Sequence, residues 1–150
     1  MKKIAIASML ALAAISASAL EVGTIVTRDY SGAVDRNGGG ITLGQKYGAN
    51  TVTAGFERFT AGTNDQDRFS LVVGREVVRI KHVSIAVKAG AAYLNNQTGQ
   101  DGYAMTVGAG ASMPLTKQVA VGLDVARQYG QDRVKASDGN TVTVGLTYKF

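Results

Sequence analysis

The chain ends in Thr141-Val142-Thr143-Val144-Gly145-Leu146-Thr147-Tyr148-Lys149-Phe150, the most informative stretch of the sequence. Apolar or aromatic residues occupy every second position of it, namely Val142, Val144, Leu146, Tyr148 and Phe150. Successive side chains of a β-strand point to opposite faces, so this alternation predicts a strand with one apolar and one polar face. A half-buried strand of a water-soluble protein alternates in the same way, so the pattern alone leaves the class of sheet open.

The opposite end of the chain has the three parts of a secretory signal peptide. Lys2 and Lys3 precede the apolar run 4–15, which is shorter than the roughly 20 residues that a membrane-spanning helix needs. Ala17-Ser18-Ala19 then matches the small-x-small pattern of a cleavage site. We therefore expect residues 1–19 to be removed, which leaves residues 20–150 as one domain.

The composition of the expected mature chain argues against several functions. It carries 14 basic and 11 acidic residues, and the resulting net charge of +3 is spread along the chain. We therefore expect no nucleic-acid partner, because such proteins concentrate basic residues on one surface. The absence of cysteine excludes disulfides and thiolate metal sites. Nineteen glycines and a single proline suit a chain of strands joined by tight turns.

Eight alternating segments follow the expected signal peptide. They cover about 21–30, 40–47, 51–60, 68–78, 82–94, 103–113, 118–129 and 140–150, with ends uncertain by about 2–4 residues. The connections alternate between long ones (31–39, 61–67, 95–102 and 130–139) and short ones (48–50, 79–81 and 114–117). Strands of roughly 9–11 residues joined in this rhythm are typical of outer-membrane barrels. We predict an all-β fold, a closed antiparallel eight-stranded transmembrane β-barrel with an up-and-down meander.

The two faces of the predicted strands differ in composition. Apolar residues fall on one parity, and nine glycines fall on the other: Gly23, Gly44, Gly55, Gly74, Gly90, Gly108, Gly110, Gly122 and Gly145. The glycine face also carries four acids and four bases: Glu21, Lys46, Glu57, Arg68, Glu76, Lys88, Asp124 and Lys149. An eight-stranded barrel has room inside only for side chains, and unpaired charges there would be costly. We therefore predict a lumen filled by an ion-pair network, with a small ion path along the same residues as the alternative.

Three arginines interrupt the apolar face near the ends of predicted strands: Arg58, Arg75 and Arg127. All three have the parity of the lipid-facing residues, at positions where an arginine costs about 1 kcal/mol or less. We expect Arg58 and Arg127 at the outer rim of the barrel. Their charged groups could reach the lipid phosphates while their apolar stems stay in the membrane. A specific contact with lipopolysaccharide is the alternative.

Together these features resemble the small eight-stranded outer-membrane proteins of Gram-negative bacteria, the superfamily of the OmpA membrane domain, OmpX and the opacity proteins. The terminal Phe150, with apolar residues at alternate positions before it, is similar to the insertion signal of such barrels. The resemblance implies recognition by the barrel-insertion machinery and contact with outer-membrane lipid and lipopolysaccharide. It also implies a structural or porin-like role in the cell envelope, and we expect a monomer with periplasmic termini and external long loops.

Two other classes of protein remain as alternatives. A secreted or pilus-type β-sandwich subunit also ends in an alternating strand with a tyrosine near the terminus, although such subunits usually have a cysteine pair. A lipid-modifying barrel enzyme is the other alternative, because lipid A deacylases use a His and a Ser two residues apart, as His82 and Ser84 are. No Asn follows Ser84, and both residues lie near a predicted periplasmic turn, so we expect no enzyme activity.

The remaining motifs are weak candidates for ligand binding. Asn64, Asp65 and Asp67 lie together but lack the glycine and the distal glutamate of a calcium loop. Gly38-Gly39-Gly40 is followed by neither Lys-Ser/Thr nor a predicted helix, so we interpret it as the flexible end of a loop and not as a phosphate-binding loop. We therefore expect neither a metal nor a cofactor.

Overall fold

The computed structural model of the protein describes residues 20–31, 34–60, 65–96, 101–131 and 138–150. The predicted signal peptide and Asn64 lie outside these residues. The strands are β1 (Leu20–Ser31), β2 (Val34–Tyr47), β3 (Asn50–Thr60), β4 (Gln66–Ile80), β5 (Val83–Asn96), β6 (Gly102–Pro114), β7 (Val119–Gly130) and β8 (Gly139–Lys149). No helix among the described residues is long and apolar enough to cross a membrane.

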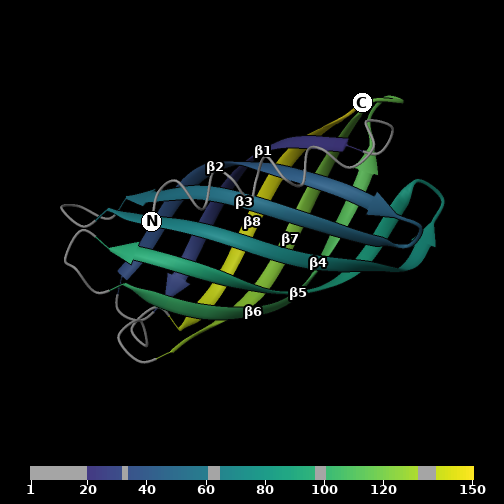
Figure 1. Ribbon diagram of the computed structural model, residues 1–150. Coiled ribbons are helices and arrows are strands. Elements are labelled where there is room, and N and C mark those ends of the chain that lie inside the picture. Colours follow the sequence, from purple (N-terminus) through teal and green to yellow (C-terminus); the bar gives the residue numbers. More distant parts are fainter. Residues whose placement is uncertain (1–19, 32–33, 61–64, 97–100, 132–137) are drawn as a thin grey trace.

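The sheet is a closed barrel (Figure 1). Each strand pairs antiparallel with its neighbours in sequence, and β8 pairs with β1 from Glu21–Lys149 to Ser31–Gly139. The predicted eight-stranded meander is thereby confirmed. A β-sandwich would leave two separate sheets with free edges, so that alternative is wrong.

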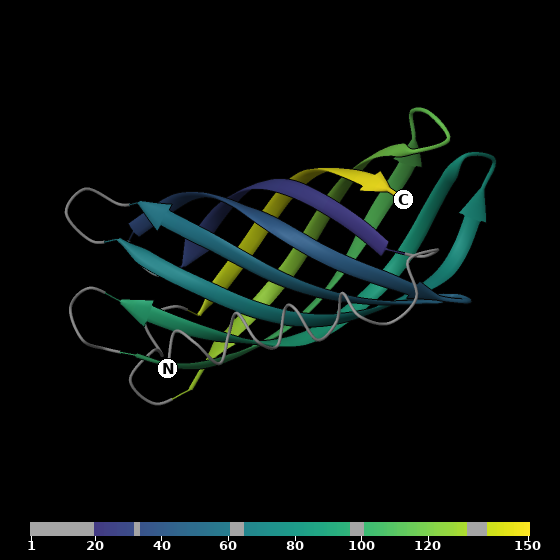
Figure 2. The ribbon, with the colours of Figure 1, turned by 45° about the horizontal axis from the view of Figure 1, so that its top comes forward.

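The two ends of the barrel differ, and we name them the turn end and the loop end. The turn end holds Leu20, Phe150 and the turns 48–49, 81–82 and 115–118. The opposite end, the loop end, holds Ser31, Thr60, Asn96 and Gly130, the last residues of β1, β3, β5 and β7. In Figure 2 the β4–β5 hairpin extends past the C-terminus at the turn end.

Strand β2 corrects the first predicted loop. The sequence analysis predicts a loop at 31–39, whereas β2 begins at Val34 and includes Gly38-Gly39-Gly40. A Cβ added at Gly38 would come within 2.6 Å of the Phe59 ring, and one at Gly40 would overlap the backbone of β3. The interpretation of these glycines as a flexible loop end is wrong, because they mark a close approach between two paired strands.

Strand β4 contains an irregularity that changes which side chains face inward. Its register against β5 shifts between Glu76 and Val78, as in a β-bulge. Val77 and Val78 are both exposed, and Arg79 pairs with Ser84, whose side chain lines the interior. The bulge therefore brings Arg79 to the same face as Glu76.

The outer face of the barrel carries large apolar side chains with nothing packed on them. Ile41, Leu71, Val87 and Leu123 are between 49% and 53% exposed, and they come from strands all around the barrel. An apolar surface of this extent on a soluble protein would be unusual, because large contiguous apolar patches mark membrane or protein contacts.

Candidate functional site: the barrel lumen

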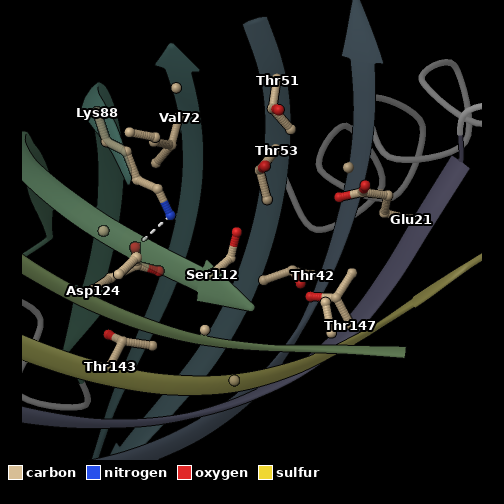
Figure 3. Close-up of a pocket in the computed structure, with 18 of the residues that line it drawn as sticks. Glu21, Thr42, Thr51, Thr53, Val72, Lys88, Ser112, Asp124, Thr143 and Thr147 are labelled. Atoms are coloured by element: carbon tan, nitrogen blue, oxygen red, sulfur yellow. Dashed lines mark hydrogen bonds and ion pairs between the residues drawn. The ribbon is translucent and has the colours of Figure 1, made fainter. Parts of the chain in front are cut away.

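The inner faces of the strands enclose a cavity of about 530 Å³, which we name the vestibule. It begins at the turn end, beside Ala49, Lys81 and His82, and reaches as far as Glu57 and Arg68. Its walls are rich in hydroxyl groups, which come from Thr42, Thr51, Thr53, Ser70, Ser84, Thr106, Ser112, Thr143 and Thr147. Figure 3 shows several of these side chains pointing into the cavity. The vestibule is therefore polar and is entered from the turn end.

Five buried side chains close the inner limit of the vestibule, and we name them the central cluster: Thr27, Glu57, Phe59, Arg68 and Gln128. Each is 7% exposed or less. Arg68 Nε and Nη2 lie 2.7 and 2.5 Å from Glu57 Oε2, and the guanidinium carbon lies 4.6 Å from the centre of the Phe59 ring. Arg68 Nη1 donates to Gln128 Oε1 at 3.2 Å. Because β4 and β7 are not neighbours in the barrel, this last hydrogen bond crosses the bore.

Glu57 is held from a second side as well. Thr27 Oγ1 donates to Glu57 Oε1 at 2.6 Å, and the same hydroxyl lies 2.8 Å from Thr143 Oγ1. A buried carboxylate is stable when it is paired with a cation and its remaining lone pairs are hydrogen-bonded. The central cluster meets both conditions.

Packing continues from the central cluster toward the loop end. Leu94 and Gln66 are almost fully buried, and Arg36 Nη1 donates to Gln66 Oε1 at 2.7 Å. Ala92 and Ala104 pair with each other across β5 and β6 beside Leu94 and are also buried. The half of the lumen near the loop end is therefore filled by side chains.

Three further ion pairs line the vestibule. Lys88 Nζ lies 2.5 Å from Asp124 Oδ1, and this pair is marked in Figure 3. Lys46 Nζ lies 3.5 Å from Glu76 Oε2. Lys149 Nζ lies 3.5 Å from Glu21 Oε1. The eight charged residues named from the sequence thus all lie on the inner face, and the structure brings them together as four pairs.

Several side chains of this site were not predicted from the sequence, among them Thr27, Phe59 and Arg79. Phe59 is fully buried beside Arg68, although it continues the inward parity of Glu57 and could have been found from that position. Arg79 Nη2 lies 2.8 Å from Glu76 Oε2. Regular alternation would place Arg79 outside, because Glu76 and Arg79 differ by an odd number of residues, and only the bulge reverses this.

Arg58 and Arg127 lie on the outer face of the barrel near the loop end, and both side chains are exposed. Arg58 Nε and Nη2 donate to the Asp67 carboxylate at 2.7 and 3.0 Å. Arg127 Nη1 donates to Asn140 Oδ1 at 3.4 Å, and its guanidinium carbon lies 5.7 Å from the centre of the Tyr129 ring. Arg58 is therefore held by a carboxylate, whereas Arg127 has only neutral partners in these contacts.

The apolar residues of β8 lie on the outer face of the barrel. Val144, Leu146, Tyr148 and Phe150 are 40% to 66% exposed, whereas Val142 on the same face is half-buried. The rings of Tyr148 and Phe150 meet edge to face with their centres 4.9 Å apart. The backbone nitrogen of Phe150 donates to the carbonyl of Leu20 at 3.1 Å, so the last residue stays attached to β1.

The His-Ser motif lies at the mouth of the vestibule. His82 is in the β4–β5 turn, and Ser84 Oγ accepts a hydrogen bond from Arg79 Nε at 3.2 Å. In the parts of the chain that the structure describes, no three His, Cys, Asp or Glu side chains form a group that could hold a metal ion.

Comparisons with known proteins identify the fold. No protein-family model and no curated protein matches the chain. Among solved structures, the crystal structure of Neisserial surface protein A is similar with a TM-score of 0.70 and 11% identity, over 87% of this chain and 96% of that one. The chain has the fold of an outer-membrane β-barrel. The expected architectural resemblance is thereby confirmed.

Designed proteins share this architecture. A de novo designed transmembrane β-barrel is similar with a TM-score of 0.55 and 13% identity, over 90% of this chain and 98% of that one. The designed barrel TMB2.3 gives a TM-score of 0.53 and 19% identity, over 91% and 98%. Because designed barrels match without common descent, these likenesses concern the fold and not the function.

Proposed function

We propose that this outer-membrane barrel serves the cell envelope as a closed structural protein and does not act as an open pore. The central cluster is the observation that carries the proposal, since the hydrogen bond from Arg68 to Gln128 crosses the bore between β4 and β7. An ion passing along the axis would have to break the hydrogen bond from Arg68 to Gln128, and leaving a buried charged group without a hydrogen-bond partner is costly. A porin-like path, the second candidate, would need this cluster to open. The proposal assigns the protein no enzymatic reaction.

The proposed orientation places the turn end in the periplasm and the loop end outside the cell. Even-stranded barrels of this class have short periplasmic turns and longer external loops, which supports the assignment. In this orientation the outer face of β8, from Val142 to Phe150, is the surface that the insertion machinery recognises. We propose a monomer surrounded by lipid.

Arg58 and Arg127 would then lie at the level of the outer leaflet. We propose that Arg127 contacts lipopolysaccharide phosphates more readily than Arg58, because Asp67 already neutralises Arg58. Removing the carboxylate with Asp67→Asn should make the two arginines equivalent in a lipopolysaccharide-binding assay.

Electrical recording in planar lipid bilayers tests the closed barrel. We expect the wild-type protein to insert without producing stepwise current. A shift of the band between unheated and boiled samples on SDS gels confirms that the same preparation is folded. Reproducible current steps from the wild-type protein would overturn the proposal.

Two double variants locate the closure. Glu57→Ser with Arg68→Ser removes both charges of the central cluster together and should produce small current steps. Lys88→Ser with Asp124→Ser removes the vestibule pair and should stay silent. Current from the second variant alone would place the barrier in the vestibule and contradict the assignment to the central cluster.

A further inference from the structure

Basic side chains predominate at the mouth of the vestibule. Four cations line this region of the cavity, Lys46, Arg79, Lys81 and Lys149, and two carboxylates face them, Glu21 and Glu76. Deeper in the cavity the charges balance, because Lys88 pairs with Asp124 and Arg68 with Glu57. The lining therefore carries an excess of two positive charges, and both belong to the mouth.

The two carboxylates hold Lys46 and Lys149 only loosely, whereas Arg79 is bound closely to Glu76. Glu76 Oε2 is shared between Arg79 at 2.8 Å and Lys46 at 3.5 Å, and Lys149 lies 3.5 Å from Glu21. Charge-assisted hydrogen bonds between such groups are usually about 2.7–2.9 Å long. The Lys46 and Lys149 side chains are 36% and 43% exposed. Since an ammonium group has three donors, both lysines can bind another anion without losing their present partners.

The walls behind the mouth suit a polar ligand. Thr42, Thr53 and Thr147 present hydroxyl groups to the cavity (Figure 3). A Cβ added at Gly74 or Gly122 would find its nearest neighbour at 3.5 or 3.7 Å, so the wall here is not tightly packed against these glycines. A volume of about 530 Å³ also lies within the range of small-molecule sites, roughly 300–1,000 Å³.

We propose that the vestibule binds a small polar solute that carries two or more anionic groups, either phosphates or carboxylates. The solute enters at the turn end, is attracted by the basic mouth, and stops at the central cluster. A recess with low-dielectric walls and charges of one sign concentrates ions of the opposite sign. The solute needs two anionic groups because the cations lie in two places. Lys149 lies on β8, whereas Lys46 and Arg79 lie together on other strands.

Calorimetric titration of the full barrel in a non-ionic detergent tests this proposal. Pyrophosphate and citrate are the anionic probes, and sucrose is the neutral probe of similar size. We expect saturable binding of at least one anion, weakening as salt is added, and no binding of sucrose. The anion that binds shows whether the groups recognised are phosphates or carboxylates.

Charge-removing variants make the test specific. Lys46→Gln with Lys149→Gln should weaken anion binding on the order of tenfold or more, because two charge-assisted contacts are lost. Lys117→Gln is the matched control, since it removes one positive charge from the β6–β7 turn at the same end but outside the cavity lining. If the double variant does not fold, as judged by its gel migration, Lys149→Gln alone replaces it.

Three results would overturn the proposal: no saturable binding of either anion, an equal effect of Lys117→Gln, or equal binding of sucrose. The anion site rests on the proposed closed lumen, but the two proposals can be refuted independently. A wild-type barrel that conducts and still binds anions would refute only the closed lumen. A silent barrel that binds neither anion would refute only the site.

Discussion

The two halves of the lumen are built from the same residue types and have opposite properties. Near the loop end, Glu57 and Arg68 are buried, in direct contact and hydrogen-bonded to Thr27 and Gln128. Near the turn end, Glu21 and Lys149 lie 3.5 Å apart beside an open cavity. The Glu57–Arg68 pair therefore belongs to a closed half of the lumen, whereas the Glu21–Lys149 pair lines an accessible half. The two halves differ in packing and in hydrogen bonding, and not in the type of charged residue.

Some of the inward-facing glycines differ in the same way, although a Cβ at Gly108 or Gly110, which line the vestibule, would also clash. A Cβ at Gly38 or Gly55 would come within 2.6 or 2.7 Å of a neighbouring side chain, and one at Gly40 would overlap the backbone. In contrast, Gly44 and Gly122 have their nearest neighbours at 3.4 and 3.7 Å. The glycines of β2 and β3 near the central cluster thus allow close packing, whereas these two near the turn end help to form the vestibule.

The largest expected effect comes from removing one partner of the buried pair. Arg68→Met keeps the side-chain bulk but leaves Glu57 buried without a cation, which should cost about 3–5 kcal/mol of unfolding free energy. Lys149→Met removes a half-exposed partner and should cost about 1 kcal/mol or less. Urea unfolding in lipid vesicles measures both. Equal losses would mean that the two halves do not differ in energetic terms.

A smaller difference is expected between two glycines. Gly40→Ala places a methyl group against the backbone of Phe56 and Glu57, and overpacking of this kind should cost about 1–3 kcal/mol. Gly122→Ala has room for the methyl group and should change stability by about 1 kcal/mol at most, in either direction. The same unfolding assay compares them. A Gly122→Ala variant as unstable as Gly40→Ala would show that the vestibule is more tightly packed than described.

A third difference, of similar size, concerns single hydroxyl groups. Thr27→Val removes the donor to Glu57 and should cost about 1.5–3 kcal/mol, as hydrogen bonds to charged groups do. Thr53→Val changes a residue that lines the open cavity and should cost less than about 1 kcal/mol. If Thr27→Val were neutral, the carboxylate would not depend on this hydrogen bond.

Much of the architecture could be predicted because alternation reports directly on which face a side chain occupies. The number of strands and the inward parity of residues such as Lys88 and Asp124 follow from it, and the rhythm of long and short connections indicates the order of the strands. The first loop was wrong because a run of glycines looks the same in a flexible loop and in a strand that passes close to its neighbour. Gly38-Gly39-Gly40 is the second case.

Other features of the site are not encoded in the alternation. Parity shows that a side chain points inward, but it does not show how deep the side chain lies or what packs beside it. Glu57 and Glu21 are therefore equivalent in the sequence, although one is buried and the other lines an open cavity. The bulge that turns Arg79 toward Glu76 depends on pairing with β5, which is a tertiary contact.

Thiol accessibility tests the division of the lumen most directly, because the chain contains no cysteine of its own. Thr53→Cys and Thr27→Cys each place one thiol on the inner face, in the vestibule and in the central cluster respectively. A charged, membrane-impermeant thiol reagent should modify Thr53→Cys rapidly. Modification of Thr27→Cys should be about 100-fold slower, because it requires local opening that costs on the order of 3 kcal/mol. Equal rates at the two positions would contradict a lumen that is open at one end and closed at the other.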